Sequence, residues 1–197
     1  MNYIEHIKEI MNDNYGTLLT SDLAKNNIPR TYLSIMEKSG EIQRVAWGVY
    51  VAEDMMEDEM YIFQSRNKRA VFSHETALYL HGLTDRTPLA FSVTVPSGYH
   101  ATTLKESGCK VFFIKVDLCE LGVTSLKSPH GNLIRTYDLE RTICDVLRSR
   151  NKIDDQIVND AVKGYVKRKE KKLSLLNQYA EQFSIQKIVR QYIEVML

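Results

Sequence analysis

The first fifty residues show two rhythms of apolar and polar positions. Apolar residues recur every three or four positions from Tyr3 to Met11, with charged residues between them, which predicts an amphipathic helix over residues 3–12. Thr20 is a typical N-cap for a short second helix over residues 21–25, and Asp22 lies in its first turn. Pro29 at a first helical position begins a third helix, which ends near Lys38.

A β-hairpin is predicted after these helices. Residues 42–45 and 49–51 are β-type segments on either side of Ala46, Trp47 and Gly48, and we expect no strand before them. This order of elements is that of a winged helix-turn-helix. In such a domain the third helix enters the major groove of DNA and the hairpin tip contacts the flanking backbone.

The third helix has an apolar side and a polar side. Leu33, Ile35 and Met36 are expected to face inward, and the outward positions then hold residues suited to a DNA groove: Arg30, Thr31, Tyr32, Ser34 and Lys38. Trp47 fits either a wing residue near the sugar-phosphate backbone or an anchor that packs the hairpin on the helices. A protein-docking module remains an alternative for the whole unit.

Residues 53–197 have a mixed pattern. An acidic segment over 53–63 predicts a helical connection, Ser73 is a candidate N-cap, and apolar strands are expected over 91–95, 110–115 and 133–136. From Asp138, a candidate N-cap for a helix over 139–148, the period becomes helical again, with helices along the stripe 153–166 and around 173–181 and 185–194. We therefore predict an α+β protein: a winged helix-turn-helix over 1–52, then a mixed α/β domain over 53–197 that ends in a helical, basic segment.

Charge is unevenly distributed along the 197 residues. The net charge is only +1, but residues 141–197 hold twelve basic and seven acidic side chains, whereas residues 1–52 hold five and six. The basic excess gathers at Arg148, Arg150, Lys152, Lys163, Lys167, Arg168, Lys169, Lys171 and Lys172. This region is either a solvated helix face or a surface for nucleic acid or an acidic partner.

Several classes of protein do not fit the sequence. The longest apolar runs have four residues, far short of the roughly 20 that a membrane span needs, and the N-terminus has no uninterrupted apolar core of a secretory signal, so we expect a soluble, cytoplasmic protein. Three scattered cysteines suit neither disulfides nor a zinc site. The common phosphate, dinucleotide, zinc and hydrolase motifs do not occur. We expect no enzyme, metal or cofactor, and a structural role for His74 and His81.

Three stretches of the chain together resemble the AbiEi antitoxins. Residues 19–24 (LTSDLA) with 39–45 (SGEIQRV) and 48–50 resemble the N-terminal winged helix of that family. Residues 73–78 (SHETAL) with 81–83, and 137–145 (YDLERTICD), resemble its downstream landmarks. By position, the residues that match the DNA-reading elements are Ser21, Lys25, Arg30, Thr31, Tyr32, Lys38 and Arg44.

The resemblance implies the antitoxin of a type IV toxin-antitoxin, phage abortive-infection pair. Such an antitoxin represses its own promoter as paired copies on inverted repeats of double-stranded DNA. It also opposes a nucleotidyltransferase-like toxin without a stable complex. Residues 138–145 are expected to cap and pack a helix rather than perform catalysis. The alternatives are a winged-helix regulator with a ligand-sensing C-terminal domain and no toxin partner, and an interaction module that never touches DNA.

Overall fold

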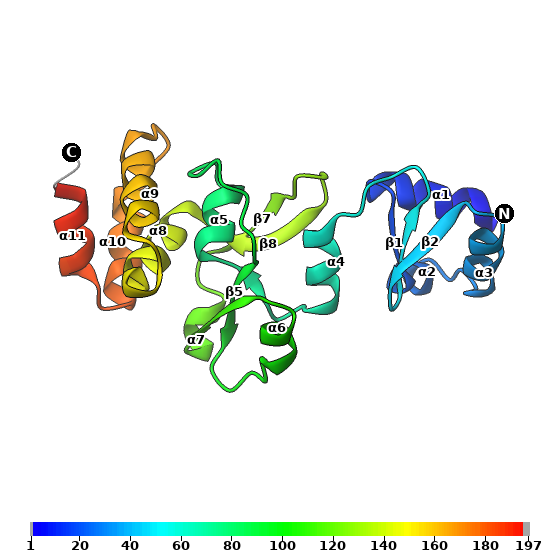
Figure 1. Ribbon diagram of the computed structural model, residues 1–197, viewed down its shortest axis with the longest axis horizontal. Coiled ribbons are helices and arrows are strands. Elements are labelled where there is room, and N and C mark those ends of the chain that lie inside the picture. Colours follow the sequence, from blue (N-terminus) through cyan, green and yellow to red (C-terminus); the bar gives the residue numbers. More distant parts are fainter. Residues whose placement is uncertain (1, 195–197) are drawn as a thin grey trace. The chain divides into compact units, whose positions relative to one another are not determined.

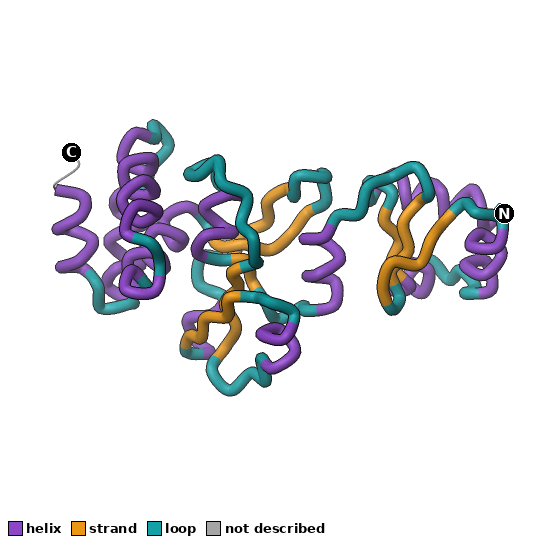
Figure 2. The backbone as a smooth tube through the Cα atoms, viewed as in Figure 1, coloured by secondary structure: helices purple, strands orange, loops and turns teal. Residues whose placement is uncertain are grey.

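The protein, described by a computed structural model over residues 2–194, is α+β and divides into two compact units. Unit 1 comprises residues 1–68 together with 127–134, and unit 2 comprises residues 69–126 and 135–197. Figure 1 shows the elements in chain order, and Figure 2 distinguishes helices, strands and loops.

Unit 1 combines four helices with a three-stranded antiparallel sheet of order β1-β3-β2. Its elements are α1 (Tyr3–Asp13), β1 (Thr17–Leu19), α2 (Thr20–Lys25), α3 (Thr31–Lys38), β2 (Ile42–Ala46), β3 (Val49–Ala52) and α4 (Glu59–Arg66). Apolar residues at helical spacing meet in one core, in which Ile7, Leu23, Leu33 and Met36 are buried. The predicted first helix and the hairpin strands are therefore confirmed.

Three details of unit 1 differ from the sequence prediction. The strand β1 precedes α2 and was not expected, because its three residues are too few to show a period and pair only once β3 is beside them. The N-cap of α2 is Leu19 rather than Thr20, and the Leu19 N–H donates to Asp22 Oδ2 at 3.1 Å. The Thr20 hydroxyl donates instead to the Gly48 carbonyl oxygen at 3.3 Å. The third helix, α3, begins at Thr31, two residues after Pro29.

The predicted helical connection after residue 52 is only partly helical. Residues 53 and 54 form a turn and residues 55–58 are irregular. The helix α4 begins at Glu59 because Asp58 caps it, with Oδ1 accepting the Tyr61 N–H at 3.0 Å. Asp58 is fully buried, and its Oδ2 accepts Ser128 Oγ at 2.5 Å and Asn132 Nδ2 at 2.9 Å. These bonds join α4 to the loop between β7 (Val123–Lys127) and β8 (Leu133–Tyr137), and the predicted boundary at residue 52 falls inside unit 1.

Unit 2 contains a mixed sheet and a group of helices. The sheet has the order β6-β5-β4-β8-β7, with β5 parallel to β6, β4 parallel to β8, and β4 antiparallel to β5. Its strands are β4 (Val71–Phe72), β5 (Ser92–Pro96), β6 (Lys110–Ile114), β7 (Val123–Lys127) and β8 (Leu133–Tyr137). The strands predicted near 91–95, 110–115 and 133–136 are present, whereas β4 and β7 were not predicted.

The helices of unit 2 are α5 (His74–Leu80), α6 (Thr102–Glu106), α7 (Val116–Cys119), α8 (Leu139–Arg148), α9 (Asp155–Lys167), α10 (Leu173–Gln182) and α11 (Gln186–Glu194), with a 3-10 turn at Arg150–Lys152. Of these, α5, α9, α10 and α11 pack against α8, and Figure 1 shows α8 to α11 side by side. The helix predicted after Asp138 has the predicted bounds, and the Asp138 side chain accepts the Arg141 N–H at 2.8 Å. None of the helices within residues 2–194 has the length and apolar composition needed to cross a bilayer.

Candidate nucleic-acid interface

The helix α3 separates its buried residues from its polar ones. Leu33 and Met36 lie in the core of unit 1, which leaves the opposite face to residues that are all exposed: Arg30, Thr31, Ser34 and Lys38. This polar face is the one that the sequence predicted. Ile35 was expected to face inward, but it is 50% exposed. Leu33 and Met36 face the core, and at helical spacing this places Ile35 at the edge of the buried face.

Tyr32 does not stand free on the polar face. Its ring packs against Tyr3 of α1, with ring centroids 5.1 Å apart and an angle of 49° between the planes, and the residue is half-buried. The prediction that Tyr32 points outward is therefore corrected. Its ring holds α3 against α1.

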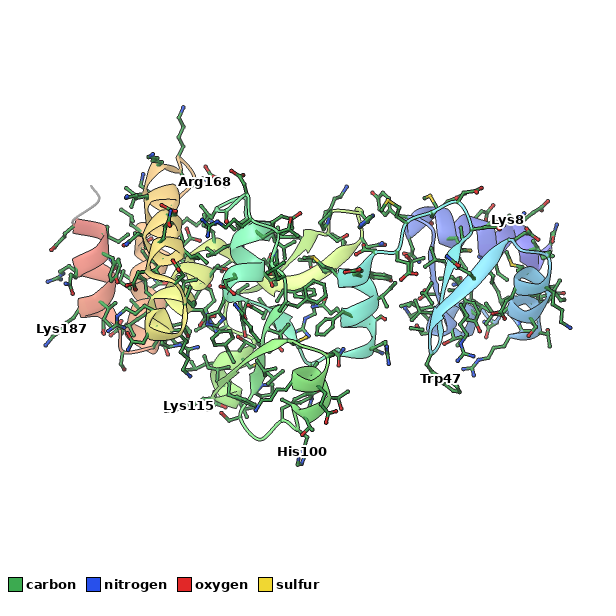
Figure 3. All side chains as sticks on the ribbon, viewed as in Figure 1. Lys8, Trp47, His100, Lys115, Arg168 and Lys187 are labelled. Atoms are coloured by element: carbon green, nitrogen blue, oxygen red, sulfur yellow. The ribbon has the colours of Figure 1, made fainter. Side chains whose placement is uncertain are left out.

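The hairpin tip carries an exposed aromatic and a cation. Trp47 is 82% exposed, which leaves it outside the core and decides against the packing anchor; Figure 3 shows it projecting at the tip. The Arg44 guanidinium carbon lies 4.7 Å from the Trp47 ring centroid, within the range of a cation–π contact. Gly48 has φ +73°, and a Cβ there would lie 2.7 Å from Thr20 Oγ1, so the tight tip depends on glycine.

The helix α2 adds two further predicted residues. Ser21 and Lys25 are both exposed, and Lys25 Nζ lies 3.3 Å from Asp22 Oδ1. An exposed pair of this kind contributes little to stability, so the lysine is free to exchange its partner for a phosphate.

The predicted basic surface of unit 2 divides into free and engaged side chains. Lys163 and Lys167 are exposed one turn apart on α9, and Lys169 and Lys172 are exposed in the loop that follows. Lys152 is exposed in the 3-10 turn after α8. These lysines form the part of the predicted surface that is open to a partner.

The other basic residues of that region are bonded within the fold. Arg168 Nη2 donates to the carbonyl oxygens of His81 at 2.6 Å and Gly82 at 3.1 Å; Figure 3 labels it beyond the end of α9. Arg148 pairs with Asp145 at 3.0 Å. Arg150 and Lys171 each donate to a backbone carbonyl, that of Leu147 and that of Arg168 respectively. The sequence showed the charge of these residues, but their carbonyl and carboxylate partners come from folding.

Residues 138–145 cap α8 and pack it, as predicted. Asp138 caps α8 and also accepts the Tyr179 hydroxyl at 2.8 Å. Glu140 is buried and accepts the Lys172 N–H at 2.8 Å and the Tyr165 hydroxyl at 3.3 Å. The motif therefore ties α8 to α9 and α10.

Arg141 and Asp145 form an ion pair with no exposed side-chain surface, at 3.0 Å between Nε and Oδ2. The Arg141 guanidinium also donates to the carbonyl oxygens of Leu118 and Leu121. The helical spacing of these two residues, four apart, is the sequence signal for the pair, but it did not indicate their burial.

The two histidines bond to different groups. His74 is fully buried between Ser73 Oγ at 2.9 Å and Ser149 Oγ at 3.0 Å, and His81 Nε2 lies 2.8 Å from the Tyr137 carbonyl oxygen. Burial lowers the pKa of both rings, that of His74 well below its usual value. Within residues 2–194, no three His, Cys, Asp or Glu side chains come together as a possible metal site.

Comparison with known proteins adds little to this description. No protein-family model matches the chain, and no curated protein matches it. Among solved structures, the chain is similar to the RV2827C protein from Mycobacterium tuberculosis, with a TM-score of 0.49 and 9% identity over 95% of this chain and 79% of that one.

Proposed function

We propose that this protein is a DNA-binding repressor of its own promoter and the antitoxin of a type IV pair of the AbiEi kind. The observation that carries the DNA-binding half is the exposed polar face of α3, opposite a buried apolar face and followed by a hairpin with Arg44 and Trp47 at its tip. A winged helix-turn-helix uses such a face to contact base edges and such a tip to contact the backbone.

In this proposal the two units contribute differently to DNA affinity. Unit 1 carries eight basic and eleven acidic side chains, so it attracts phosphate weakly as a whole. Unit 2 carries eighteen basic and fourteen acidic side chains, among them the exposed Lys163 and Lys167. Because phosphate neutralisation supplies most nonspecific affinity, α3 would read sequence while the lysines of unit 2 supply much of the attraction.

The antitoxin half of the proposal comes from the resemblance to the AbiEi antitoxins. Residues 137–145, one of the resembling stretches, build the centre of unit 2, which suits a landmark that preserves a fold. In the proposal unit 2 opposes a nucleotidyltransferase-like toxin without forming a stable complex with it. The toxin would be encoded beside this protein.

A promoter-binding experiment tests the DNA-binding half with the full chain. Arg30→Ala is expected to abolish specific retardation of the protein's own promoter and to release a reporter gene from repression. Lys8→Ala is the matched control, because it removes an exposed cation of unit 1 that pairs with Glu41 and lies on α1. Retained repression in Arg30→Ala, with an unchanged fold, would favour an interaction module that never touches DNA.

The lysines of unit 2 are tested by salt dependence. Substitution of Lys163 and Lys167 by Gln is expected to weaken promoter binding and to reduce the slope of log affinity against log salt by up to about 0.9 for each lost phosphate contact. A slope equal to that of the unaltered protein would assign these lysines another role.

A growth experiment tests the antitoxin half. Co-expression of the full chain with the neighbouring gene product is expected to restore growth that the neighbour alone arrests, and Arg30→Ala is expected to retain this rescue while losing repression. Growth arrest that the full chain does not relieve would refute the antitoxin.

A second candidate is a transcriptional regulator with a ligand-sensing unit 2 and no toxin partner. A pocket of about 610 Å³ in unit 2 favours it, because this volume is in the range of small-molecule sites. The absence of a toxin gene beside this one, together with promoter release by a small ligand, would distinguish it from the antitoxin.

A further inference from the structure

We propose that this pocket of unit 2 binds a nucleotide through its phosphate groups. The pocket lies along β6 and the residues that end α8, and its walls include Lys110, Phe112, Phe113, Arg148, Ser149 and Lys152. The inference does not depend on the proposed antitoxin, which uses none of the β6 residues; it names a ligand class for the pocket that the second candidate, the ligand-sensing regulator, would use.

The first argument is the charge of the pocket. Lys110, Arg148 and Lys152 line it. Two carboxylates pair with these cations: Glu75, 2.6 Å from Lys110 Nζ, and Asp145, 3.0 Å from Arg148 Nη2. One positive charge remains, that of Lys152, which is exposed and placed to meet a ligand directly. An anionic ligand is therefore favoured.

The second argument is a chain of hydrogen bonds that ends at the pocket wall. Thr94 Oγ1 donates to Ser73 Oγ at 2.9 Å, Ser73 Oγ lies 2.9 Å from His74 Nδ1, and His74 Nε2 lies 3.0 Å from Ser149 Oγ. If Ser73 donates to Nδ1, the ring is protonated at Nε2 and donates to Ser149. Ser149, which lines the pocket, then keeps its hydroxyl hydrogen for another acceptor. Such a donor suits a phosphate oxygen.

The backbone supports this arrangement at two places. His74 has φ +48°, a backbone conformation that costs free energy in a residue other than glycine. The fold maintains this conformation, and the His74 ring stacks on Phe112 with 3.5 Å between the ring centroids.

The strand β6 lies at one end of the sheet order, so one of its edges has no neighbouring strand among residues 2–194. The Lys110 N–H and the Ile114 carbonyl oxygen form their hydrogen bonds on the β5 side. Alternation then turns the N–H groups of Val111 and Phe113 toward the open edge, as further donors.

The size of the pocket favours a large anion over a small one. A bare phosphate would fill little of 610 Å³, whereas a nucleotide fits within the range of volumes that protein pockets offer to such ligands. Asn151 lines the pocket and offers an amide to a base edge. A nucleotide could be free or the phosphorylated end of a strand, and both present the same chemistry.

Isothermal titration of the full chain tests the proposal. ATP and AMP represent free nucleotides, and a 5′-phosphorylated oligonucleotide represents a strand end. Tight binding of a free nucleotide or of the oligonucleotide supports the nucleotide site. The ligand that binds more tightly shows whether the natural ligand is a free nucleotide or a strand end. Adenosine is expected to bind at least tenfold more weakly than ATP, because it lacks the phosphates.

Variants connect binding to this pocket. Lys152→Ala and Ser149→Ala are each expected to weaken nucleotide binding about tenfold or more, since each removes a hydrogen bond to a charged phosphate group. Lys187→Ala removes an exposed lysine of α11 that does not line the pocket and is expected to change binding less than twofold. Circular dichroism verifies that each variant remains folded.

Four results of the nucleotide titrations would overturn the proposal. They are no binding of any nucleotide at millimolar concentration, equal binding of adenosine and ATP, inorganic phosphate binding as tightly as ATP, and nucleotide binding unaffected by both pocket variants. Binding of an acidic peptide in place of nucleotides, lost in Lys152→Ala, would assign the open edge of β6 to a protein partner and would equally refute the nucleotide.

Discussion

The substitution Arg141→Met tests how unit 2 is held together. Arg141 has no exposed side-chain surface, and its guanidinium bonds to Asp145 and to the carbonyl oxygens of Leu118 and Leu121. Its guanidinium carbon also lies 4.0 Å from the Tyr137 ring centroid and 4.5 Å from that of Phe183. Methionine retains much of the volume but none of the donors.

The expected loss of unfolding free energy follows from these contacts. Removing one partner of a buried ion pair costs about 3–5 kcal/mol, because the other charge remains buried without compensation. Asp145 retains one partner in this variant, because Arg148 Nη2 lies 3.0 Å from its Oδ1, which favours the lower end of that range. The two carbonyl oxygens lose their donors and add to the cost. We therefore expect a loss of about 3 kcal/mol.

Urea unfolding at pH 7, followed by far-ultraviolet circular dichroism, measures the loss. Arg148→Met is the matched control, because it removes a guanidinium from the same carboxylate but at a side chain that is 26% exposed. The control is expected to lose about 1 kcal/mol, as a partly solvated pair does. Equal losses in the two variants, or a loss below about 1 kcal/mol in Arg141→Met, would show that burial does not determine the strength of this network.

Two further predictions concern other buried groups. Burial, with Arg148 and Arg141 nearby, lowers the pKa of His74 in the folded protein, so below pH 6.5 the unfolded chain binds the extra proton. As the pH falls below 6.5, the unfolding free energy should then fall by up to about 1.4 kcal/mol per pH unit from this one group. His74→Gln should reduce this dependence of the unfolding free energy on pH, measured by urea unfolding between pH 7 and 5. An unaltered pH dependence would contradict the assignment. Asp58→Ala removes the acceptor of the Tyr61 N–H, Ser128 and Asn132, so we expect a loss of about 2–4 kcal/mol and faster proteolysis at residues 127–134, whereas Asp54→Ala, at an exposed position, should change little. Unchanged proteolysis in Asp58→Ala would show that this loop does not depend on α4.

Local signals predicted many of the elements and some of the residues of the candidate interface. Helical spacing and the Asp138 cap were sufficient for α8, because both act within one or two turns. The polar face of α3 followed from the same periodicity. Short strands such as β1 and β4 escaped prediction, because a segment of two or three residues shows no period of its own and exists only beside its partner strand.

The sequence by itself determined where charge gathers, which faces of α1 and α3 are apolar, and the α+β class, since composition and periodicity are properties of neighbouring residues. Only the tertiary structure decided which charged residues are available. Arg168 meets carbonyl oxygens 86 and 87 positions earlier in the chain, whereas Lys167 beside it stays exposed. Likewise, His74 and Ser149, 75 positions apart, come within hydrogen-bond distance at one pocket wall. Burial and pairing of this kind depend on contacts between distant parts of the chain, which local patterns do not encode.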